Sequence, residues 1–353
     1  MQLQSSFLPR RTRAKVPVVL AVASAFAAVA CGGAPAPPAA SAPPTPAPMT
    51  AEQSIDWYKK CWELFNTKAW DNFQNCYAPD ATSESVDSGQ APAKGRAAII
   101  EAAKATVAPN PDVHGELQLI LANGQNLLSV ALWKGTHTAP MPGPGGKSIP
   151  ATGKPFGFLM AHTVELDPGR TAVQADADYV EVGTLLGQLG LSKAPVRKAM
   201  VSGAAAPTVV IAKNDEAEAK NVAAIQTQLE AFNKHDVAAS ASSLADKYVL
   251  HEIALPADSD KKKALASLKD LFKGFGDVKL TASQVYGAGD YVVVAGTFEG
   301  TNTGPMPHLG IKKGTDKPVK SRFIEIIRLE NGKVAEDWLF YNGLAFAAQL
   351  GLS

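Results

Sequence analysis

The chain has few cysteines, few aromatic residues and almost no net charge, and each shortage excludes a class of function. Only three of the 353 residues are cysteine, 7% are aromatic, and the formal net charge is +1. Single-stranded nucleic acid is bound by basic stripes interleaved with aromatic side chains, and the sequence shows no such pattern, so we expect no nucleic-acid partner. The six histidines are scattered, and Cys61 and Cys76 are too far apart for a metal pair. We therefore expect neither a metal ion nor a cofactor.

The N-terminal apolar run is too short to cross a bilayer. It covers fifteen residues, Val16 to Ala30, after a basic start, whereas a spanning helix needs about 20. This pattern predicts a secretory signal peptide over residues 1–30. Residues Ala28 to Cys31 resemble the lipobox of bacterial lipoproteins, in which the cysteine becomes the lipidated N-terminus. The alternative is an ordinary signal peptide, which would leave Cys31 free.

Residues 31–50 follow the signal and consist almost entirely of Gly, Ala, Pro, Ser and Thr. Such a segment cannot build a core, and proline-rich chain is stiff and extended, at about 3.1 Å per residue. We expect it to tether a folded body to the lipid. The lipoprotein resemblance implies an exported protein whose membrane partner is reached through that lipid. Gly32 after the cysteine favours an outer-membrane address in the bacterial cell envelope.

An exported lipoprotein would face an oxidising compartment, where a pair of cysteines tends to close. We therefore predict a disulfide between Cys61 and Cys76, which in the chain-entropy model would contribute about 3 kcal/mol. Two buried free thiols are the alternative, because sequence does not show whether the sulfurs meet.

One module is present twice in the chain. Two segments of the first half return in the second: Gly135–Pro142 as Gly300–Pro307, and Gln188–Ser192 as Gln349–Ser353. Self-similarity of this kind fixes domain count and boundaries. It predicts one domain at residues 51–192 and another at 214–353, joined by a linker at 193–213 whose conformation the sequence leaves open.

Each copy begins with helical periodicity and continues with strand periodicity. The first helix of each copy carries a matching apolar stripe: Ile55, Tyr58, Trp62 and Phe65, then Val222, Ile225, Leu229 and Phe232. Thr50 and Gln53 form a capping box before the first stripe. A short helical segment is expected to reach through Tyr77–Asp80 and Leu244–Lys247. Further helices are predicted at 96–106 and 262–273.

Strand formers and turn signals fill the second half of each copy. The predicted strands are 117–121, 127–133, 158–166 and 173–182 in the first copy, and 279–286, 291–298, 321–329 and 334–341 in the second. Asp167-Pro168-Gly169 and Asn331-Gly332 are typical of hairpin turns. Helices followed by an antiparallel sheet indicate an α+β fold in each copy.

This order carries specific motifs at matching places. They are Thr152-Gly153-Lys154-Pro155 with Gln188-Leu189-Gly190, and Thr315-Asp316-Lys317-Pro318 with Gln349-Leu350-Gly351. With these motifs, the chain resembles the SnoaL-like polyketide and ester cyclases of the nuclear transport factor 2-like superfamily over nearly all of both copies. The resemblance implies two tandem cone-shaped domains, each a curved sheet packed on N-terminal helices around a pocket.

Strand alternation places one titratable side chain on the apolar face of each copy. Glu325 lies among Phe323, Ile327 and Leu329, and His162 holds the aligned place in the first copy. Burial would disfavour the charged form of both groups, which is how pockets make acids and bases usable near neutrality. The alternative is that both groups are satisfied by hydrogen bonds and have no chemical role.

The family resemblance also implies a general base shortly before the final Gln-Leu-Gly, where the cyclases carry an aspartate. The matching positions here are Glu181 and Asn342. Asparagine cannot act as a base, so the second copy is not expected to be a cyclase of the family type. Asp176 and Asp178 lie nearby in the first copy as substitutes.

Three functions remain open. The leading hypothesis is a module that binds a small apolar or amphipathic molecule without fast chemistry, using Glu325, Asn342, Trp338 and Tyr341 in the second copy. The alternative is a cyclase- or isomerase-type enzyme in which the first copy transfers a proton, with Glu181 as base and His162 as its partner. The third hypothesis is that each sheet serves as an association surface. The two copies would then form an internal pseudo-dimer, or the chain would form a homo-oligomer.

Overall fold

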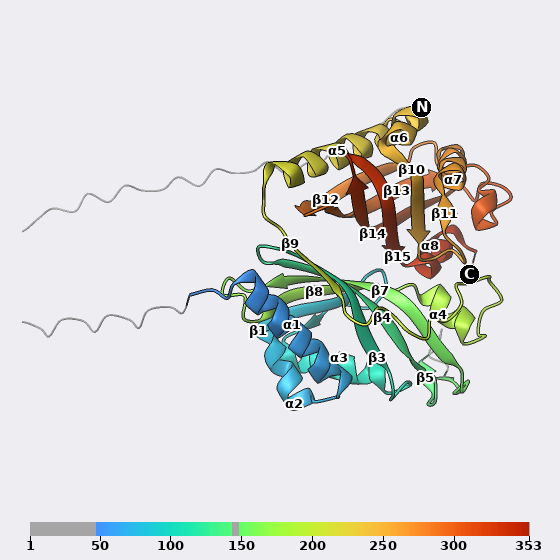
Figure 1. Ribbon diagram of the computed structural model, residues 1–353. Helices are drawn as coiled ribbons and strands as arrows, with labels where there is room; N and C mark the ends of the chain where they lie inside the picture. Colours follow the sequence, from blue (N-terminus) through green and yellow to red (C-terminus); the bar gives the residue numbers. More distant parts are fainter. Residues whose placement is uncertain (1–46, 143–147, 353) are drawn as a thin grey trace, which may run out of the picture. The chain divides into compact units, whose positions relative to one another are not determined.

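A computed structural model describes residues 47–142 and 148–352 of the chain (Figure 1). The predicted signal peptide, Cys31 and nearly all of the tether lie outside the described residues. Two α+β domains follow one another, the first before residue 193 and the second from residue 214 onward. Within the described ranges, no helix is long and apolar enough to cross a bilayer.

The first domain opens with helix α1, whose start is fixed by the predicted capping box. The Gln53 amide N–H donates to Thr50 Oγ1 at 3.2 Å, and the Thr50 amide N–H donates to Gln53 Oε1 at 2.9 Å. The elements run in this order: α1 (Ala51–Asn66), α2 (Trp70–Phe73), η1 (Gln74–Cys76), β1 (Tyr77–Ser85), β2 (Ala93–Lys94), α3 (Arg96–Val107), β3 (His114–Asn123), β4 (Asn126–Thr136), β5 (Met141–Pro142), β6 (Ser148–Ile149), β7 (Pro155–Leu166), β8 (Val173–Tyr179) and α4 (Val182–Gln188).

The second domain repeats this order. Its elements are α5 (Glu216–Asn233), α6 (Val237–Ser243), β10 (Leu244–Glu252), β11 (Ser259–Asp260), α7 (Lys261–Gly274), β12 (Lys279–Ala288), β13 (Tyr291–Asn302), η3 (Pro307–Leu309), β14 (Lys317–Glu330), β15 (Lys333–Tyr341) and α8 (Gly343–Leu350). The predicted Asn331-Gly332 turn joins β14 to β15. Both turn residues have positive φ, which this hairpin type requires.

Each domain has one curved sheet with the same strand order. The first sheet runs β2-β1-β8-β7-β4-β3 and the second runs β11-β10-β15-β14-β13-β12. Neighbouring strands are antiparallel except where the first long strand meets the last, since β1 pairs with β8 and β10 with β15 in parallel. The registers match as well: Val164 lies opposite Asp176 in the first domain, and Ile327 lies opposite Asp337 in the second.

Two local expectations were wrong. Residues Tyr77–Asp80 and Leu244–Lys247 belong to strands β1 and β10, because each segment pairs in parallel with the last strand of its own sheet. The final strand of the first domain ends at Tyr179 and does not reach Val182, because Glu181 caps the helix that starts there. The other predicted strands and helices are confirmed, with ends that differ by a few residues.

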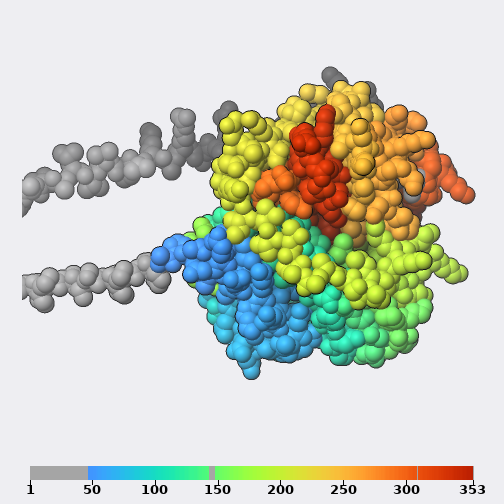
Figure 2. Space-filling model, in the orientation of Figure 1, coloured from blue at the N-terminus to red at the C-terminus, as the bar shows by residue number. Residues whose placement is uncertain are grey.

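The linker is partly a strand. Its last part, β9 (Thr208–Ile211), adds to the edge of the first sheet by pairing in parallel with β3. Further back, the Met200 amide donates to the Gly157 carbonyl at 2.9 Å. Figure 2 shows this connecting segment at the molecular surface, where Val201 is 83% exposed.

The inner face of each sheet packs on the helices, and the outer faces share a separate core. The first inner core contains a disulfide between Cys61 on α1 and Cys76 on η1. The shared core is built from matching positions of both sheets: Leu128 and Val293, Ala161 and Ile324, Tyr179 and Phe340, Val86 and Ile253. Burial of these apolar side chains joins the two domains.

Candidate functional site

A cavity of about 250 Å³ lies inside the second domain. Its walls come from helices α5, α6 and α7 and from the inner face of the sheet, and most of the lining side chains are apolar. Ligand sites commonly have this character, an apolar cleft with a few polar groups that fix orientation. The cavity is therefore the first candidate for a functional site.

Smaller side chains open this space in the second domain. At positions matched by sheet register and helix spacing, the first domain has Phe73, Phe158, Trp62 and Trp133 where the second has Ser240, Ser321, Leu229 and Phe298. All four replacements reduce volume. Protein interiors are close-packed, so a loss of this size leaves a space unless the backbone collapses into it.

Aromatic side chains fill the matching interior of the first domain. Trp62 meets Trp133 edge to face with ring centroids 6.4 Å apart, and Trp133 lies 5.3 Å from Phe65. A side chain on Gly115 would collide with the Trp62 ring, so this glycine makes room for the indole. Packed aromatic rings therefore occupy this part of the first domain's interior.

Three carboxyl groups line the cavity of the second domain. Asp337 on β15 is 4% exposed, and its Oδ2 accepts a hydrogen bond of 3.2 Å from the Tyr248 hydroxyl. Burial raises the pKa of Asp337 well above its usual range, and the neighbouring Glu325 raises it further. Burial also raises the pKa of Glu325, while its interaction with Asp337 lowers it. Burial therefore favours the protonated forms of both carboxyl groups.

The third carboxyl is Glu252 at the end of β10. Its Oε1 accepts a 2.7 Å hydrogen bond from the Tyr341 hydroxyl. Burial raises the pKa of Glu252, and both the hydrogen bond from Tyr341 and the charge of Arg197 oppose that shift. Tyr248, Glu252, Glu325, Asp337 and Tyr341 thus form one polar wall in an otherwise apolar cavity.

His162 holds the place of Glu325 in the first domain, as the alignment predicted, and is buried in a network. Its Nδ1 lies 2.7 Å from the Tyr58 hydroxyl, which is 2.8 Å from Ser129 Oγ. Its Nε2 lies 3.4 Å from Asp176 Oδ2 and 3.7 Å from Asp178 Oδ1. Burial alone would lower the pKa of His162, but Tyr58, Asp178 and Asp176 outweigh it and raise the pKa well above its usual value. His162 is therefore a buried residue placed between the Tyr58 hydroxyl and two aspartates.

Sequence comparison places both domains in one family. The model of the SnoaL-like polyketide cyclase family matches residues 52–188 and again residues 223–350, together well over half of the chain. The chain belongs to the SnoaL-like polyketide cyclase family. The two matches, one in each domain, agree with the repeated motifs of the sequence.

Solved structures of similar fold each match one domain's length of this SnoaL-like chain. IdmH from Streptomyces antibioticus is 25% identical with a TM-score of 0.34, covering 39% of this chain and 99% of its own. A SnoaL-like protein from Jannaschia sp. CCS1 is 19% identical with a TM-score of 0.36, covering 40% and 98%. TsrD from Streptomyces laurentii is 21% identical with a TM-score of 0.34, covering 40% and 100%. No significant match was found among curated proteins.

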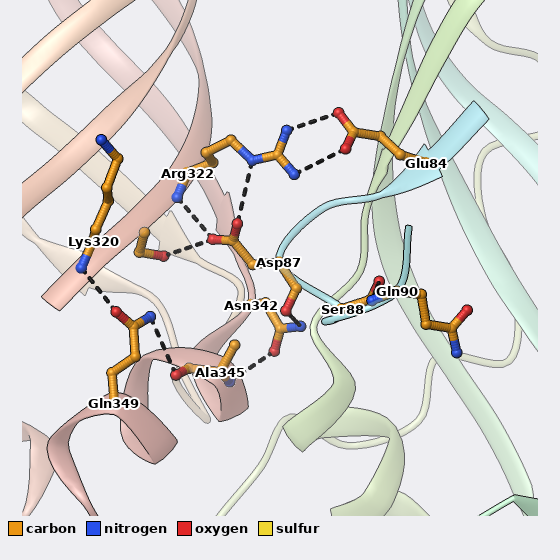
Figure 3. Close-up of polar contacts among 10 residues, drawn as sticks. Glu84, Asp87, Ser88, Gln90, Lys320, Arg322, Asn342, Ala345 and Gln349 are labelled. Atoms are coloured by element: carbon orange, nitrogen blue, oxygen red, sulfur yellow. Dashed lines mark hydrogen bonds and ion pairs between the residues drawn. The ribbon is translucent and has the colours of Figure 1, made fainter. Parts of the chain in front are cut away.

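The two positions expected to hold the SnoaL-like general base are helix caps. Glu181 is 4% exposed, and its carboxylate accepts hydrogen bonds from the Gly183 and Thr184 amides at the start of α4. Burial raises the pKa of Glu181, whereas the backbone amides of Thr184, Gly183 and Gly343, the last on α8, lower it. Asn342 accepts from the Ala345 amide at 3.0 Å and donates to the Asp87 carbonyl at 3.2 Å (Figure 3). Neither side chain lines the cavity of the second domain.

Of the other predicted ligand-binding residues, Glu325 and Tyr341 line the cavity and Trp338 does not. Trp338 points to the opposite face of β15, where it stacks on His251 with ring centroids 4.9 Å apart. The period of a strand explains this outcome, because residues 337, 339 and 341 share one face and 338 lies on the other.

Sequence reasoning missed Asp337, Tyr248 and Glu252. Counting back from Tyr341 by twos reaches Asp337, so strand alternation contained the signal for that residue. The inward direction of Tyr248 and Glu252 could not be predicted, because the start of β10 was expected to be helical. Once β10 is known to be a strand, Tyr248, Leu250 and Glu252 fall on the cavity face.

Proposed function

We propose that the second domain binds a small, largely apolar molecule with one polar end. The observation that carries this proposal is the cavity itself, whose largely apolar lining includes one group of buried carboxyl and tyrosine side chains. Drug-sized ligands occupy pockets of roughly 300–1,000 Å³, so a cavity of about 250 Å³ suits a ligand smaller than those. The first domain packs against the second through the shared core, and aromatic rings occupy the part of its interior that matches the cavity.

A thermal-shift screen of the purified full-length chain tests this proposal. The panel holds small apolar compounds in neutral, anionic and cationic forms, and hits are confirmed by calorimetry. Ser240→Phe restores the bulk of Phe73 and fills the cavity, so it should abolish binding. Ser242→Phe, at an exposed position of the same helix, is the matched control and should bind as before. If no compound binds, or if Ser240→Phe binds as well as the control, the proposal fails.

A second candidate function is proton transfer in the same cavity. The two carboxyls Glu325 and Asp337 favour it, because both line the cavity, burial raises the pKa of both, and such a pair can accept a proton from a carbon acid and return one elsewhere. The family has cyclase members, which need this kind of step. Deuterium exchange at acidic C–H bonds of a ketone and ester panel, followed by NMR, tests it. Exchange that is catalysed by the chain and lost in Asp337→Asn supports this function; exchange at the uncatalysed rate excludes it.

The geometry does not favour an enzyme in the first domain. Glu181 is engaged by helix amides and His162 by Tyr58 and the two aspartates. A base and its partner must reach one substrate atom, and these two side chains are each committed to a different network.

We also infer that the chain is exported and anchored by a lipid on Cys31. The short apolar run and the lipobox-like residues before Cys31 motivate this, and the Cys61–Cys76 disulfide supports an oxidising compartment. Metabolic labelling with palmitate in a bacterial host should label the chain, and Cys31→Ser should lose the label. Equal labelling of both would contradict lipidation at this residue.

A further inference from the structure

The polar wall of the cavity has negative charge available and no positive charge to match it. Glu252, Glu325 and Asp337 all line the cavity, whereas its lining contains no lysine, arginine or histidine. Arg197 of the linker is the cation that contacts one of these residues, Glu252. Its guanidinium is bound outside the cavity, to the Glu252 carbonyl at 3.0 Å and to Asp258 at 2.7 Å.

Two buried acceptors in this cavity lack a donor. Asp337 Oδ1 and the Gln228 Oε1 on α5 receive no hydrogen bond from any group in the described part of the chain. Buried polar atoms are almost always paired, so an unpaired one calls for a partner. A ligand that brings donors would complete both acceptors, and a ligand that brings only acceptors would complete neither.

We propose that the polar end of the ligand is a protonated amine, whose N–H groups donate to Asp337 and Glu325. The apolar remainder of the amine fills the space against Leu229, Leu268 and Phe323. This inference rests on the proposed ligand-binding function and narrows its chemistry. A bare metal ion does not fit the same charge, because the described residues contain no cluster of three or more His, Cys, Asp or Glu side chains placed to hold one.

When an ammonium ion binds to these carboxyls, it replaces the positive charge of a bound proton. Burial raises the pKa of Glu325 and Asp337, and the positive charge of the ligand opposes that shift, so protons bound to these carboxyls are released. The other titratable groups on this wall are Glu252 and Tyr341, already bonded to each other, and Tyr248, which donates to Asp337. Helices α5, α6 and α7 contribute no titratable side chain to the lining. Affinity for an amine should therefore rise with pH, up to the pH at which the free amine loses its own proton.

The test uses calorimetry on the full-length chain with 2-phenylethylamine and two neutral or anionic analogues, 2-phenylethanol and phenylacetate. At pH 8 the amine should bind at least about tenfold more tightly than the alcohol, as expected for charged hydrogen bonds. Runs in phosphate and in Tris should differ in observed heat, because released protons are taken up by the buffer. Glu325→Gln and Asp337→Asn should weaken amine binding by about tenfold or more and leave alcohol binding unchanged.

Glu336→Gln is the matched control, because it removes the same charge from the same strand on the face that pairs with Arg328. It should leave amine binding unchanged. Alcohol or carboxylate binding as tight as the amine, or amine binding that weakens as pH rises from 6 to 8, would overturn the amine inference and leave the ligand-binding function standing. If none of the three compounds binds and the wider screen also yields nothing, the ligand-binding function itself is lost.

Discussion

Glu181 caps helix α4, although the family resemblance implied a catalytic role for this residue. The family resemblance implied a general base at this position, and here its carboxylate accepts hydrogen bonds from amide groups at the first turn of α4. Helix N-termini leave such amides without partners, and side-chain acceptors commonly supply them. At this position the carboxylate oxygens therefore bind backbone amides.

Replacing Glu181 by alanine should lower the free energy of unfolding by about 1 kcal/mol, because the cap is lost. Ligand binding in the second domain should be unaffected. Chemical denaturation measures the first effect and calorimetry the second, with the exposed Glu165→Ala on β7 as the control. Unchanged stability together with lost binding or activity would mean that Glu181 acts on a ligand after all.

His162 gives the first domain a pH-dependent stability. Its pKa in the folded chain lies well above the ordinary value of 6.5. Below about pH 6.5 the folded and unfolded states both hold the proton, and the interaction with Asp176 and Asp178 is fully present. As pH rises through the folded pKa the proton is lost and the stabilisation with it.

Urea denaturation of the wild-type chain at pH 6 and pH 9 should therefore show a larger loss of stability than the same comparison in His162→Gln. His114→Gln, at an exposed and loosely paired histidine, should behave like the wild type. An identical pH dependence in wild type and His162→Gln would show that this imidazole is neutral in the folded chain.

At the scale of elements, the disulfide ties helix α1 to the short helix η1 in the first domain only. The bridge closes a loop with a sequence separation of 15 residues. In the chain-entropy model its removal costs about 3 kcal/mol. The double variant Cys61→Ser/Cys76→Ser should unfold at correspondingly lower denaturant, and a reducing agent should have the same effect on the wild type. Equal stability with and without reductant would contradict this, and the cavity of the second domain should bind equally well in both forms.

Most elements were predictable from sequence because they obey local rules. The stripe from Ile55 to Phe65, the Thr50 cap and the Asn331-Gly332 turn each depend on residues close in the chain. Strands β1 and β10 were not predicted, because their pairing with the last strand of the sheet spans nearly a whole domain. Local preference around Tyr77 and Leu244 does not record such long-range contacts.

The candidate site was predictable only in part, for a related reason. Alternation found Glu325 and Tyr341, yet the existence of a cavity depends on which side chains meet across the interior. Ser240, Leu229 and Ser321 come from three separate elements, and only their combined small volume leaves a space. Family alignment, in turn, pointed to Glu181 and Asn342, whose neighbours in space turned out to be helix amides.

For the whole molecule, the two domains share a scaffold and a core but divide their roles. Leu128 and Val293, matching residues of the two sheets, meet in the shared core. At its edge, Arg322 of the second sheet donates to both oxygens of Glu84, at 2.7 and 3.0 Å, and to Asp87 at 3.2 Å (Figure 3). One domain has a packed aromatic interior, and the other has an open cavity with a polar wall.

The stoichiometry of ligand binding tests this division of roles most directly. Native mass spectrometry of the full-length chain, with the tightest-binding compound of the screen, should show one ligand per chain. Ser240→Phe should show none, and Ser242→Phe should show one. Two ligands per chain, or one that remains bound to Ser240→Phe, would contradict the account, because the site would then lie in the first domain or outside the cavity.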